Sequence, residues 1–590
     1  MAAVVLRVAR AGVPLATFWI GKLIIDTVVA ARFGHSGLST LWRLVVLEVA
    51  ISSAAVAMDK ASTVVESLFG ELCSNRMSEM LIRHAATLDL SHFEDPAFYD
   101  QLERAQRQTT GRIGLLAQLL AIAQDALTVA SLSCAVFVYS PWLLLLLFAA
   151  VLPGFLAETH FAALEYALLY RWTPERRQLD YLRFLGASDK TAKEVQIFGL
   201  ASWLVDRYRA IAGRLYQHNR RLSLRKGFAA TGLSLAGMLA YYGGYVLILA
   251  RGYYGIISVG SLTFLIASFA RSRDLTQRLL LTLGNIYEQC LYIQDLFDFF
   301  KLTPAVVSPP GAAPVPTHLS QGIVFEDVGF RYPGCNEWAV RHFNLTIGPH
   351  DRIALVGENG AGKTTVVKLL ARLYDPTEGR ILLDGVDLRH YELGSVRRAV
   401  SIIFQDFVRY DMRFDENIAV GEIDRMRKHL RQEEALNHNA QSRQEESVAH
   451  PAIVKAAERS LAASLLPRLP HGYRQMLGRR FPGGIDLSGG EWQKIALARA
   501  YIRDARVIIL DEPTAALDAR AEYEVFSRFA EQAQGQIAIL ISHRFSTVRM
   551  ADRIVVLKNG AIVEEGSHQE LLSRNGLYAE LFSLQAEGYR

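Results

Sequence analysis

The sequence predicts a membrane all-α six-helix domain with long cytoplasmic helical extensions, followed by an α/β domain. The first 300 residues hold apolar runs long enough to cross a bilayer, whereas the last 270 alternate between strand-like and helix-like segments. The Pro-rich stretch "TPAVVSPPGAAPVP" separates them and is typical of a linker. We therefore expect a membrane domain over residues 1–300, a linker over 301–320 and the α/β domain over 321–590.

The composition narrows the class of protein. Hydrophobic residues make up 51% of the chain, which is high for a soluble protein, and a net charge of +5 over 590 residues implies no nucleic-acid partner. The cysteines lack CxxC or zinc spacing, so we expect reduced structural thiols at Cys73, Cys134, Cys290 and Cys335. The apolar N-terminus has no compact core leading to a cleavage site, so we interpret it as a retained membrane helix.

Six segments are long enough to span roughly 30 Å of hydrocarbon, and the second and sixth are the weakest because they carry charges. The connections between them alternate in length. The short ones hold only Arg32 and Arg251, whereas those at 76–112 and 165–228 are long and rich in Arg and Lys. Because positive loops stay in the cytoplasm, we expect both long links and the α/β domain there. The expected spans are 4–30, 41–69, 113–139, 142–164, 229–250 and 256–283.

The two long links are themselves predicted to be helical. Apolar residues recur in them at helical spacing, with arginine on the other face. Such helices would extend the spans and could carry force to the α/β domain. The alternative is a pair of solvated surface helices.

Charged residues within the expected spans need a partner or a wet cavity, because buried charge is costly in lipid. Lys22 and Asp26 lie on one helical face, while Asp59 and Lys60 are adjacent in the second span. They either lock helices together or line a translocation path, and locking is the favoured interpretation for the first pair. Three tyrosines of the fifth span either line a cavity or serve in aromatic packing or an interfacial belt: Tyr241, Tyr242 and Tyr245.

A phosphate-binding loop occurs in the context that its chemistry requires. "RIALVGENGAGKTTVVKLLARL" is predicted to form a strand, a glycine loop and a helix. Backbone N–H groups around Gly357 and Gly362 would wrap the phosphates of ATP, Lys363 would reach the β and γ phosphates, and the Thr364 hydroxyl would bind Mg²⁺. We therefore expect an α/β P-loop ATPase domain. The predicted nucleotide contacts in the loop are Gly357, Glu358, Asn359, Gly360, Ala361, Gly362, Lys363, Thr364 and Thr365.

The stretch "RVIILDEPT" supplies two acids at the end of a second apolar strand. Asp511 would hold Mg²⁺ through water, and Glu512 would orient or deprotonate the attacking water. Two acids after a strand are often only solvated carboxylates. Here they follow the phosphate-binding loop by about 150 residues, which favours the catalytic interpretation.

The stretch "LSGGEWQKIALARA", residues 487–500, starts like a second phosphate cradle but has no lysine beside its glycine pair. Together with the two preceding motifs it resembles the ATP-binding cassette (ABC) transporters, specifically exporters with six spans fused to one nucleotide-binding domain. The resemblance implies a domain-swapped, head-to-tail dimer in which Ser488, Gly489 and Gly490 contact the nucleotide held by the opposite subunit. Two copies of the chain would then form two composite ATP sites, both able to hydrolyse ATP.

The same resemblance assigns four further residues. Tyr332 matches the aromatic residue that stacks on adenine, and Gln405 matches the glutamine that senses Mg²⁺ and faces the coupling helices. Asp518 matches the dimer-contact loop, and His543 matches the histidine that clamps the γ phosphate. By this resemblance Glu512, His543 and Gln405 are the catalytic group, and Thr364, Gln405 and Asp511 are the Mg²⁺ group.

The resemblance also implies how hydrolysis reaches the membrane. Residues 93–107 and 193–204 resemble the first and second coupling helices, which would move the spans from inward-open to outward-open when ATP closes the nucleotide domains. The chain departs from the family pattern at Glu491, where glutamine is usual, at Ala515, where serine is common, and in "LGRRFPGGID" before the signature. Residues 424–450 are charged and poor in apolar residues, which predicts a mobile surface insertion.

The function implied is ATP-driven export of an amphipathic or lipophilic substrate across the bacterial cytoplasmic membrane by alternating access of a homodimer. The expected partners are a second copy of the chain, the lipid bilayer and the transported substrate, with no nucleic acid. One alternative is half of a heterodimeric exporter. From other classes, a non-transporting ABC ATPase acting on DNA or ribosomes conflicts with the spans, an ATP-gated channel would be expected to replace Glu512, and importers usually keep spans and motor on separate chains.

Overall fold

The computed structural model divides the chain into two compact units. The membrane unit comprises Met1–Thr87 and Ala97–Leu302, and the nucleotide unit comprises Leu88–Pro96 and Thr303–Arg590. The structure describes residues 2–32, 38–95, 98, 101–103, 105–106, 114–428, 449–512, 524–529, 535–542 and 544–587.

The membrane unit is built of long helices, which confirms its predicted class. α10 runs unbroken for 53 residues and α3 for 48, well beyond the ~20 residues that a bilayer requires. The predicted helical character of the second long link is also confirmed, since α8, α9 and the first half of α10 fill it. The helices are α1 (Ala2–Ala11), α2 (Val13–Arg32), α3 (Leu38–Ala85), α6 (Gly114–Tyr139), α7 (Pro141–Arg171), α8 (Thr173–Ala187), α9 (Ala192–Ile197), α10 (Ala201–Tyr253) and α11 (Val259–Lys301).

Helices long and apolar enough to cross a membrane account for five of the expected spans. Within the described residues they are Val4–Ala31, Leu38–Ala85, Ala117–Tyr139, Pro141–Phe161 and Ala201–Tyr253. The sixth expected span falls in α11, which is long enough, but Arg271, Arg273 and Asp274 interrupt its apolar part. A crossing by α11 therefore stays a prediction.

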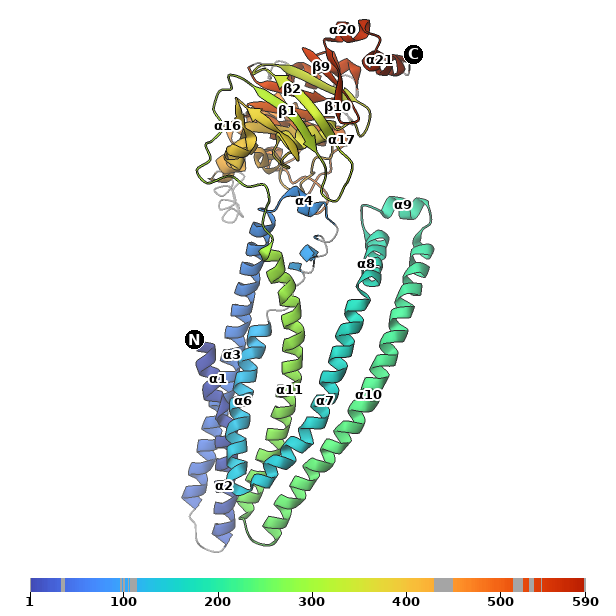
Figure 1. Cartoon of the computed structure of the whole chain (residues 1–590). Coiled ribbons are helices and arrows are strands. Elements are labelled where there is room, and N and C mark those ends of the chain that lie inside the picture. Colours follow the sequence, from blue (N-terminus) through green and yellow to red (C-terminus); the bar gives the residue numbers. More distant parts are fainter. Residues whose placement is uncertain are drawn as a thin grey trace. The chain divides into compact units, whose positions relative to one another are not determined.

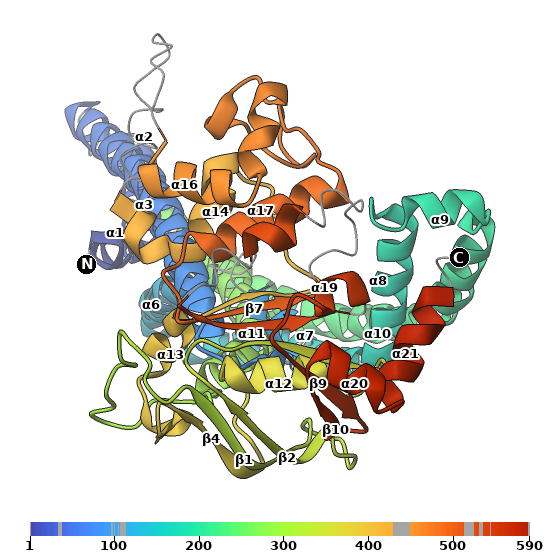
Figure 2. The same cartoon turned by 90° about the horizontal axis from the view of Figure 1, so that it is seen from above.

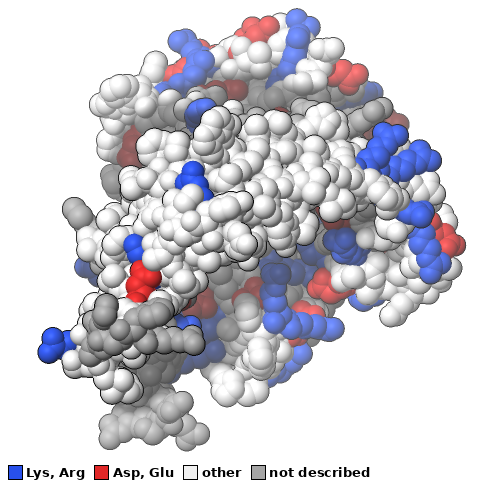
Figure 3. Space-filling view, turned by 90° about the horizontal axis from the view of Figure 1, so that it is seen from below, with Lys and Arg blue, Asp and Glu red and all other residues white. Residues whose placement is uncertain are grey.

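Packing within the membrane unit pairs α7 with α10, and α11 with α2 and α6 (Figure 1). One apolar cluster joins Leu143 and Leu147 of α7 to Ile248 of α10 and to Phe264 and Phe269 of α11. Seen from below, much of the molecular surface shows no Lys, Arg, Asp or Glu (Figure 3). Such a surface suits contact with lipid.

α7 and α10 approach each other closely at a glycine. A Cβ atom on Gly237 would lie 2.2 Å from the carbonyl oxygen of Ala150, so only glycine fits between the two backbones. Small residues at helix contacts are the usual means of bringing membrane helices into van der Waals contact.

Three of the charged residues in the spans, Lys22, Asp26 and Asp59, contact other helices, as the locking interpretation predicts. The ammonium of Lys22 donates to the Tyr139 hydroxyl at 3.0 Å. The Asp26 carboxylate accepts from the Gly260 N–H and the Ser258 hydroxyl at the start of α11, at 2.9 and 3.1 Å. In the second span, Asp59 pairs with Arg10 of α1 at 2.6 Å.

The tyrosine group of α10 is at least partly a packing feature. The Tyr241 ring stacks on Phe269, with ring centroids 5.4 Å apart, and the Arg273 guanidinium lies 4.6 Å from its centroid. Tyr242 contacts both Tyr241 and Tyr245 edge to face. These contacts favour aromatic packing for Tyr241.

The nucleotide unit contains two sheets. The larger has the order β10-β9-β3-β8-β7-β6 and is parallel except for the β9–β10 pair, whereas the smaller, β2-β1-β4-β5, is antiparallel. Central strands such as β7 and β8 are buried throughout, which is why their sequences are continuous apolar runs. The strands are β1 (Ile323–Phe330), β2 (Val340–Ile347), β3 (Arg352–Gly357), β4 (Glu378–Leu383), β5 (Val386–Asp387), β6 (Val400–Ile403), β7 (Val507–Asp511), β8 (Ile537–Ile541), β9 (Arg553–Lys558) and β10 (Ala561–Gly566).

Part of the nucleotide unit is a group of helices. α14, α16 and α17 lie together, away from the antiparallel strands β1, β2 and β4 (Figure 2). Their core includes Trp492 and also Met426, which is fully buried at the start of the expected insertion. Residues 429–448 of that insertion lie outside the described residues. The unit's helices are α4 (Leu90–Phe93), α12 (Lys363–Leu370), α13 (Leu393–Ala399), α14 (Phe414–Ala419), α16 (Pro451–Arg459), α17 (Gly489–Tyr501), α19 (Phe545–Val548), α20 (His568–Ser573) and α21 (Leu577–Glu587).

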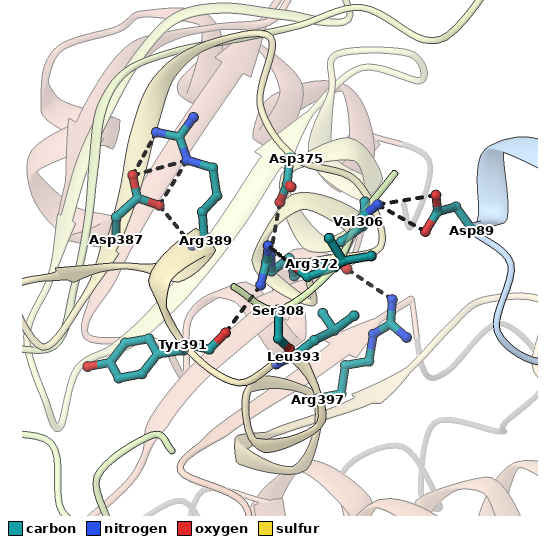
Figure 4. A network of polar contacts seen from close by, with 11 residues as sticks. Asp89, Val306, Ser308, Arg372, Asp375, Asp387, Arg389, Tyr391, Leu393 and Arg397 are labelled. Carbon is teal, nitrogen blue, oxygen red and sulfur yellow. Dashed lines mark hydrogen bonds and ion pairs between the residues drawn. The ribbon is translucent and has the colours of Figure 1, made fainter. Parts of the chain in front are cut away.

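The Pro-rich stretch after α11 is tied to the nucleotide unit by polar contacts (Figure 4). The buried Arg372 guanidinium donates to the carbonyl oxygen of Val307 at 2.9 Å and to the Asp375 carboxylate at 3.0 Å. The Ser308 hydroxyl accepts from the N–H of Leu393 at 2.7 Å. This stretch is therefore held against the domain rather than standing free.

The close approach at Gly237 leads to a stability prediction. Gly237→Ala should lower the melting temperature of the purified protein in detergent, because its methyl group forces α7 and α10 apart, at a cost of about 1–3 kcal/mol. Gly243→Ala, on the same helix with nothing within 4 Å of its added Cβ, is the matched control and should be neutral or mildly stabilising. Equal melting temperatures for the two variants would contradict the close contact.

Candidate functional site

The predicted phosphate-binding loop connects β3 to α12. Gly357 ends the strand with φ 155°, and Gly362, with φ 99°, is the N-cap of α12. A Cβ at Gly357 would lie 2.3 Å from the carbonyl oxygen of Leu557, and one at Gly362 would lie 2.8 Å from that of Ala339. Both positions therefore require glycine, and the N-terminus of α12 faces the loop with its unpaired N–H groups.

The lysine of the loop folds back over it. The Lys363 ammonium donates to the carbonyl oxygens of Gly357 and Glu358, both at 2.9 Å, and the residue is only 6% exposed. Burial lowers its pKa, although the nearby carboxylates of Asp511 and Glu512 partly oppose this shift. A buried ammonium beside the N-terminus of a helix is suited to binding an anion such as a polyphosphate.

Two oxygen donors meet beside the lysine. The Thr364 hydroxyl donates to the Asp511 carboxylate at 3.2 Å, across 147 residues of sequence. Asp511 is 2% exposed, and burial raises its pKa to about 6. Within the described residues no cluster of three or more His, Cys, Asp or Glu side chains forms a metal site. The hydroxyl and carboxylate oxygens are the hard donors that Mg²⁺ prefers, and Mg²⁺ needs few protein ligands when phosphate supplies the rest.

A second pair lies at the ends of neighbouring strands. The Gln405 amide donates to the Glu512 carboxylate at 2.9 Å. β6 and β7 are parallel neighbours, so their carboxyl ends meet at one edge of the sheet and bring these two residues together. Glu512 has a positive φ of 48°, and its N–H donates to the carbonyl oxygen of Ile541 at the end of β8. This uncommon backbone conformation is held by the strand end.

Tyr332 lies next to the helix that carries the lysine. Its hydroxyl is 3.1 Å from the Thr365 hydroxyl. Its ring packs edge to face against Phe330 and Tyr374, with centroids 5.0 and 5.6 Å away. A partly buried aromatic ring beside a phosphate-binding loop is suited to stacking on a base.

The second cradle is built on a different element. Ser488 is the N-cap of α17: its hydroxyl accepts from the N–H of Glu491, and the Glu491 carboxylate accepts from the N–H of Ser488 at 2.8 Å. Glu491 also pairs with Arg468. Although burial alone would raise the pKa of Glu491, the hydrogen bonds of Ser488 and the charge of Arg468 hold it below its ordinary value. Glu491, where glutamine is usual in the family, therefore keeps the capping geometry, and Arg468 neutralises its added negative charge.

The two cradles are not joined within one chain. Among the described residues, no hydrogen bond or ion pair connects Ser488, Gly489 or Gly490 to the glycine loop, and Ser488 is exposed. Asp518, His543 and Ala515 lie outside the described residues. Six of the fifteen residues of the expected first coupling helix, residues 93–107, also lie outside the described residues, and α4 ends at its first residue, Phe93. The second expected coupling helix falls on α9 and the start of α10.

Sequence reasoning missed two residues around Tyr332. Lys368 places its ammonium 5.1 Å from the centroid of the Tyr332 ring, and Tyr374 packs against that ring. Lys368 could have been found, because it lies one helical turn beyond Thr364 on the same helix. Tyr374 follows the helix and had no comparable signal.

Comparisons with known proteins agree with this geometry. A model of the ABC transporter family matches residues 340–515. The subtilin transport ATP-binding protein SpaT of Bacillus subtilis is 28% identical over 96% of this chain and 88% of its own. The ATP-dependent lipid A-core flippase of Alcanivorax borkumensis is 31% identical over 79% of this chain and 75% of its own. A solved structure of a bacterial Atm1-family ABC exporter with ATP bound superposes with a TM-score of 0.78, at 26% identity over 99% of this chain and 98% of that one.

These relatives share the fused arrangement of a helical membrane unit and an α/β nucleotide unit, and the predicted resemblance is confirmed. The chain belongs to the ABC exporters, multi-pass membrane proteins in which ATP hydrolysis is coupled to transport.

Proposed function

We propose that this exporter works as a homodimer with two composite ATP sites and moves an amphipathic or lipophilic substrate across the bacterial cytoplasmic membrane. The observation that carries the proposal is the pair of phosphate cradles on separate elements. The glycine loop is complete in itself at the edge of the parallel sheet, whereas Ser488 presents an exposed helix start on α17. A second copy placed head to tail would bring each exposed helix start to the other copy's loop.

Within each site the residues would divide the work. Lys363 would bind the β and γ phosphates, and Glu512, oriented by Gln405, would orient or deprotonate the attacking water. Thr364 and Asp511 would hold Mg²⁺, which when bound neutralises charge on the phosphates. Tyr332 would stack on adenine. His543 and Asp518 would complete the γ-phosphate clamp and the dimer contact, and Ser488, Gly489 and Gly490 would serve the partner's nucleotide.

The substrate class rests on the relatives and on the membrane unit. The names of two of the relatives refer to subtilin transport and to a lipid A-core flippase. A lipid combines a large apolar part with a polar end, which is the amphipathic character proposed here. The membrane unit has long apolar helices that carry a few charged residues, which suits such a substrate. Six spans, with α11 as the sixth, would place the nucleotide unit in the cytoplasm.

Replacing the proposed base should stop the motor. In lipid nanodiscs, Glu512→Gln should lower ATP turnover by on the order of 10²-fold or more, because the amide cannot accept a proton from water. Glu580→Gln, an exposed carboxylate on α21, is the matched control and should keep wild-type turnover. A well-folded wild-type dimer with no turnover, alone or with peptides and lipids added, would contradict the homodimer and point to a missing partner chain.

The raised pKa of Asp511 gives a pH-dependent prediction. Its pKa is about 6 when folded and 3.8 when unfolded, so protonation favours the folded state, and this stabilisation is lost as the pH rises through about 6. Without nucleotide, Asp511→Asn should therefore melt at a higher temperature than the wild type at pH 8, with the difference shrinking at pH 5.

Adding Mg²⁺ and a non-hydrolysable ATP analogue at pH 8 should reverse that order, because only the ionised carboxylate gains a cation. Thermal unfolding followed by tryptophan fluorescence measures both effects. A melting difference that is the same at pH 5 and pH 8, and that ligand does not change, would contradict the assignment of Asp511.

A further inference from the structure

A segment that follows α3 in the chain belongs to the nucleotide unit. Residues Leu88–Pro96 lie in the same compact unit as Thr303–Arg590. The buried Asp89 carboxylate accepts from the N–H group of Val306 (Figure 4) and from that of Ala305. Leu90 packs against the core around the two sheets. This nine-residue piece, which includes α4, is therefore anchored to the unit at its start.

The end of the same segment reaches the helix of the phosphate-binding loop. One oxygen of the Glu94 carboxylate accepts from the Lys368 ammonium at 2.9 Å, and the other accepts from the Tyr374 hydroxyl at 2.5 Å. Lys368 is on α12, five residues after Lys363, and Tyr374 follows the helix. Both oxygens of one carboxylate are thus used, and they join two groups that are 274 and 280 residues away in sequence.

Those two groups are the neighbours of Tyr332. The Lys368 ammonium lies 5.1 Å from the centroid of the Tyr332 ring and 5.9 Å from that of Tyr374. The two tyrosine rings meet edge to face at 5.6 Å. An ammonium near a ring is attracted by its negative face, and holding that ammonium in place fixes the ring as well. Glu94 therefore constrains Tyr332 through two contacts without touching it.

The charges of this group persist at neutral pH. Although burial alone would raise the pKa of Glu94, the hydrogen bonds from Tyr374 and Lys368 hold it below its ordinary value. Burial would lower the pKa of Lys368, but the hydrogen bond and charge of Glu94 together with the neighbouring Tyr332 outweigh it, so that pKa is raised. Burial, with the hydrogen bond to Glu94, also raises the pKa of Tyr374, so its hydroxyl keeps the proton it donates.

We propose that Glu94 is a positioning residue for the adenine site, which makes ATP affinity depend on the segment that follows α3. The proposal rests on the adenine-stacking function proposed for Tyr332. If Glu94 holds Tyr332 in the stacking position, then bound adenine must in turn stabilise the contacts of Glu94, because coupling between two sites is reciprocal. Binding of adenine would then stabilise the position of the segment that follows α3, through the carboxylate of Glu94.

The test compares ligands with and without the base. Glu94→Gln keeps the size of the side chain and removes its charge, so it should weaken the hold on Lys368 and lower ATP affinity by about threefold to tenfold. The affinity for inorganic tripolyphosphate, which lacks adenine, should not change. Both are measured by calorimetry on the full-length protein in nanodiscs, with Glu565→Gln, which breaks a similar pair with Arg553, as the matched control.

A second variant separates positioning from a general loss of structure. In the Tyr332→Ala background, Glu94→Gln should cause no further loss of ATP affinity, because the ring through which it acts is gone. Equal losses for ATP and tripolyphosphate, unchanged ATP affinity, or additive losses in the double variant would overturn the proposal for Glu94. If Tyr332→Ala alone leaves ATP affinity unchanged, the adenine-stacking function of Tyr332 fails, and the proposal for Glu94 fails with it.

Discussion

The nucleotide site depends on charge held in a nearly dry place. Lys363 and Asp511 are 6% and 2% exposed. Burial lowers the pKa of Lys363 and raises that of Asp511, so in both residues it favours the neutral form. Ionised groups in such a place are stable only with a charged partner. Carbonyl oxygens of the loop stabilise the Lys363 ammonium in part by accepting its hydrogen bonds. The Thr364 hydroxyl stabilises the Asp511 carboxylate in part by donating to it. A magnesium polyphosphate, with charges of both signs, matches what remains.

The sheet explains why these groups meet. β3, β7, β8 and β6 are parallel, so the loop after β3 and the residues that end β7 share the carboxyl edge of the sheet. Gln405, just beyond β6, is brought to the same edge and contacts Glu512. The start of α17 lies in the helical group, where Leu487 and Trp492 are buried, although later residues of the helix, such as Leu497, pack against β6, β7 and β8. The proposed hydrolytic residues thus meet at one end of the strands, whereas Ser488 is proposed to serve the nucleotide of a partner chain.

Much of this could be predicted from the sequence because the signals are local. The glycine loop, the apolar strand before Asp511 and the glycine pair after Ser488 each occupy a short stretch with a definite backbone requirement. The sixth span was harder to predict, because the charges near Arg271 interrupt its apolar run. The charged residues of the first span illustrate another limit: Lys22 and Asp26 share a helical face, yet each contacts a different helix.

Contacts between distant stretches could not be predicted. Glu94 has no local motif, and its partners Lys368 and Tyr374 are more than 270 residues away in the sequence. The sequence indicates a helical link around Glu94. The pairing of Glu94 with Lys368 depends on the folded nucleotide unit, which brings the two residues together. The contacts of Asp89 could not be predicted either, because its carboxylate accepts from backbone N–H groups, which carry no sequence signal.

The claim that each ATP site is shared between two chains is tested most directly with mixed dimers. One chain carries Lys363→Ala, and the other carries Gly489→Asp, which places a carboxylate where phosphate should bind yet favours the helix start. With a different affinity tag on each chain, mixed dimers can be purified and their ATP turnover compared with that of each mutant homodimer. Shared sites predict turnover well above both homodimers, because one site then combines an intact loop with an intact signature. Mixed dimers no more active than either homodimer would contradict the account.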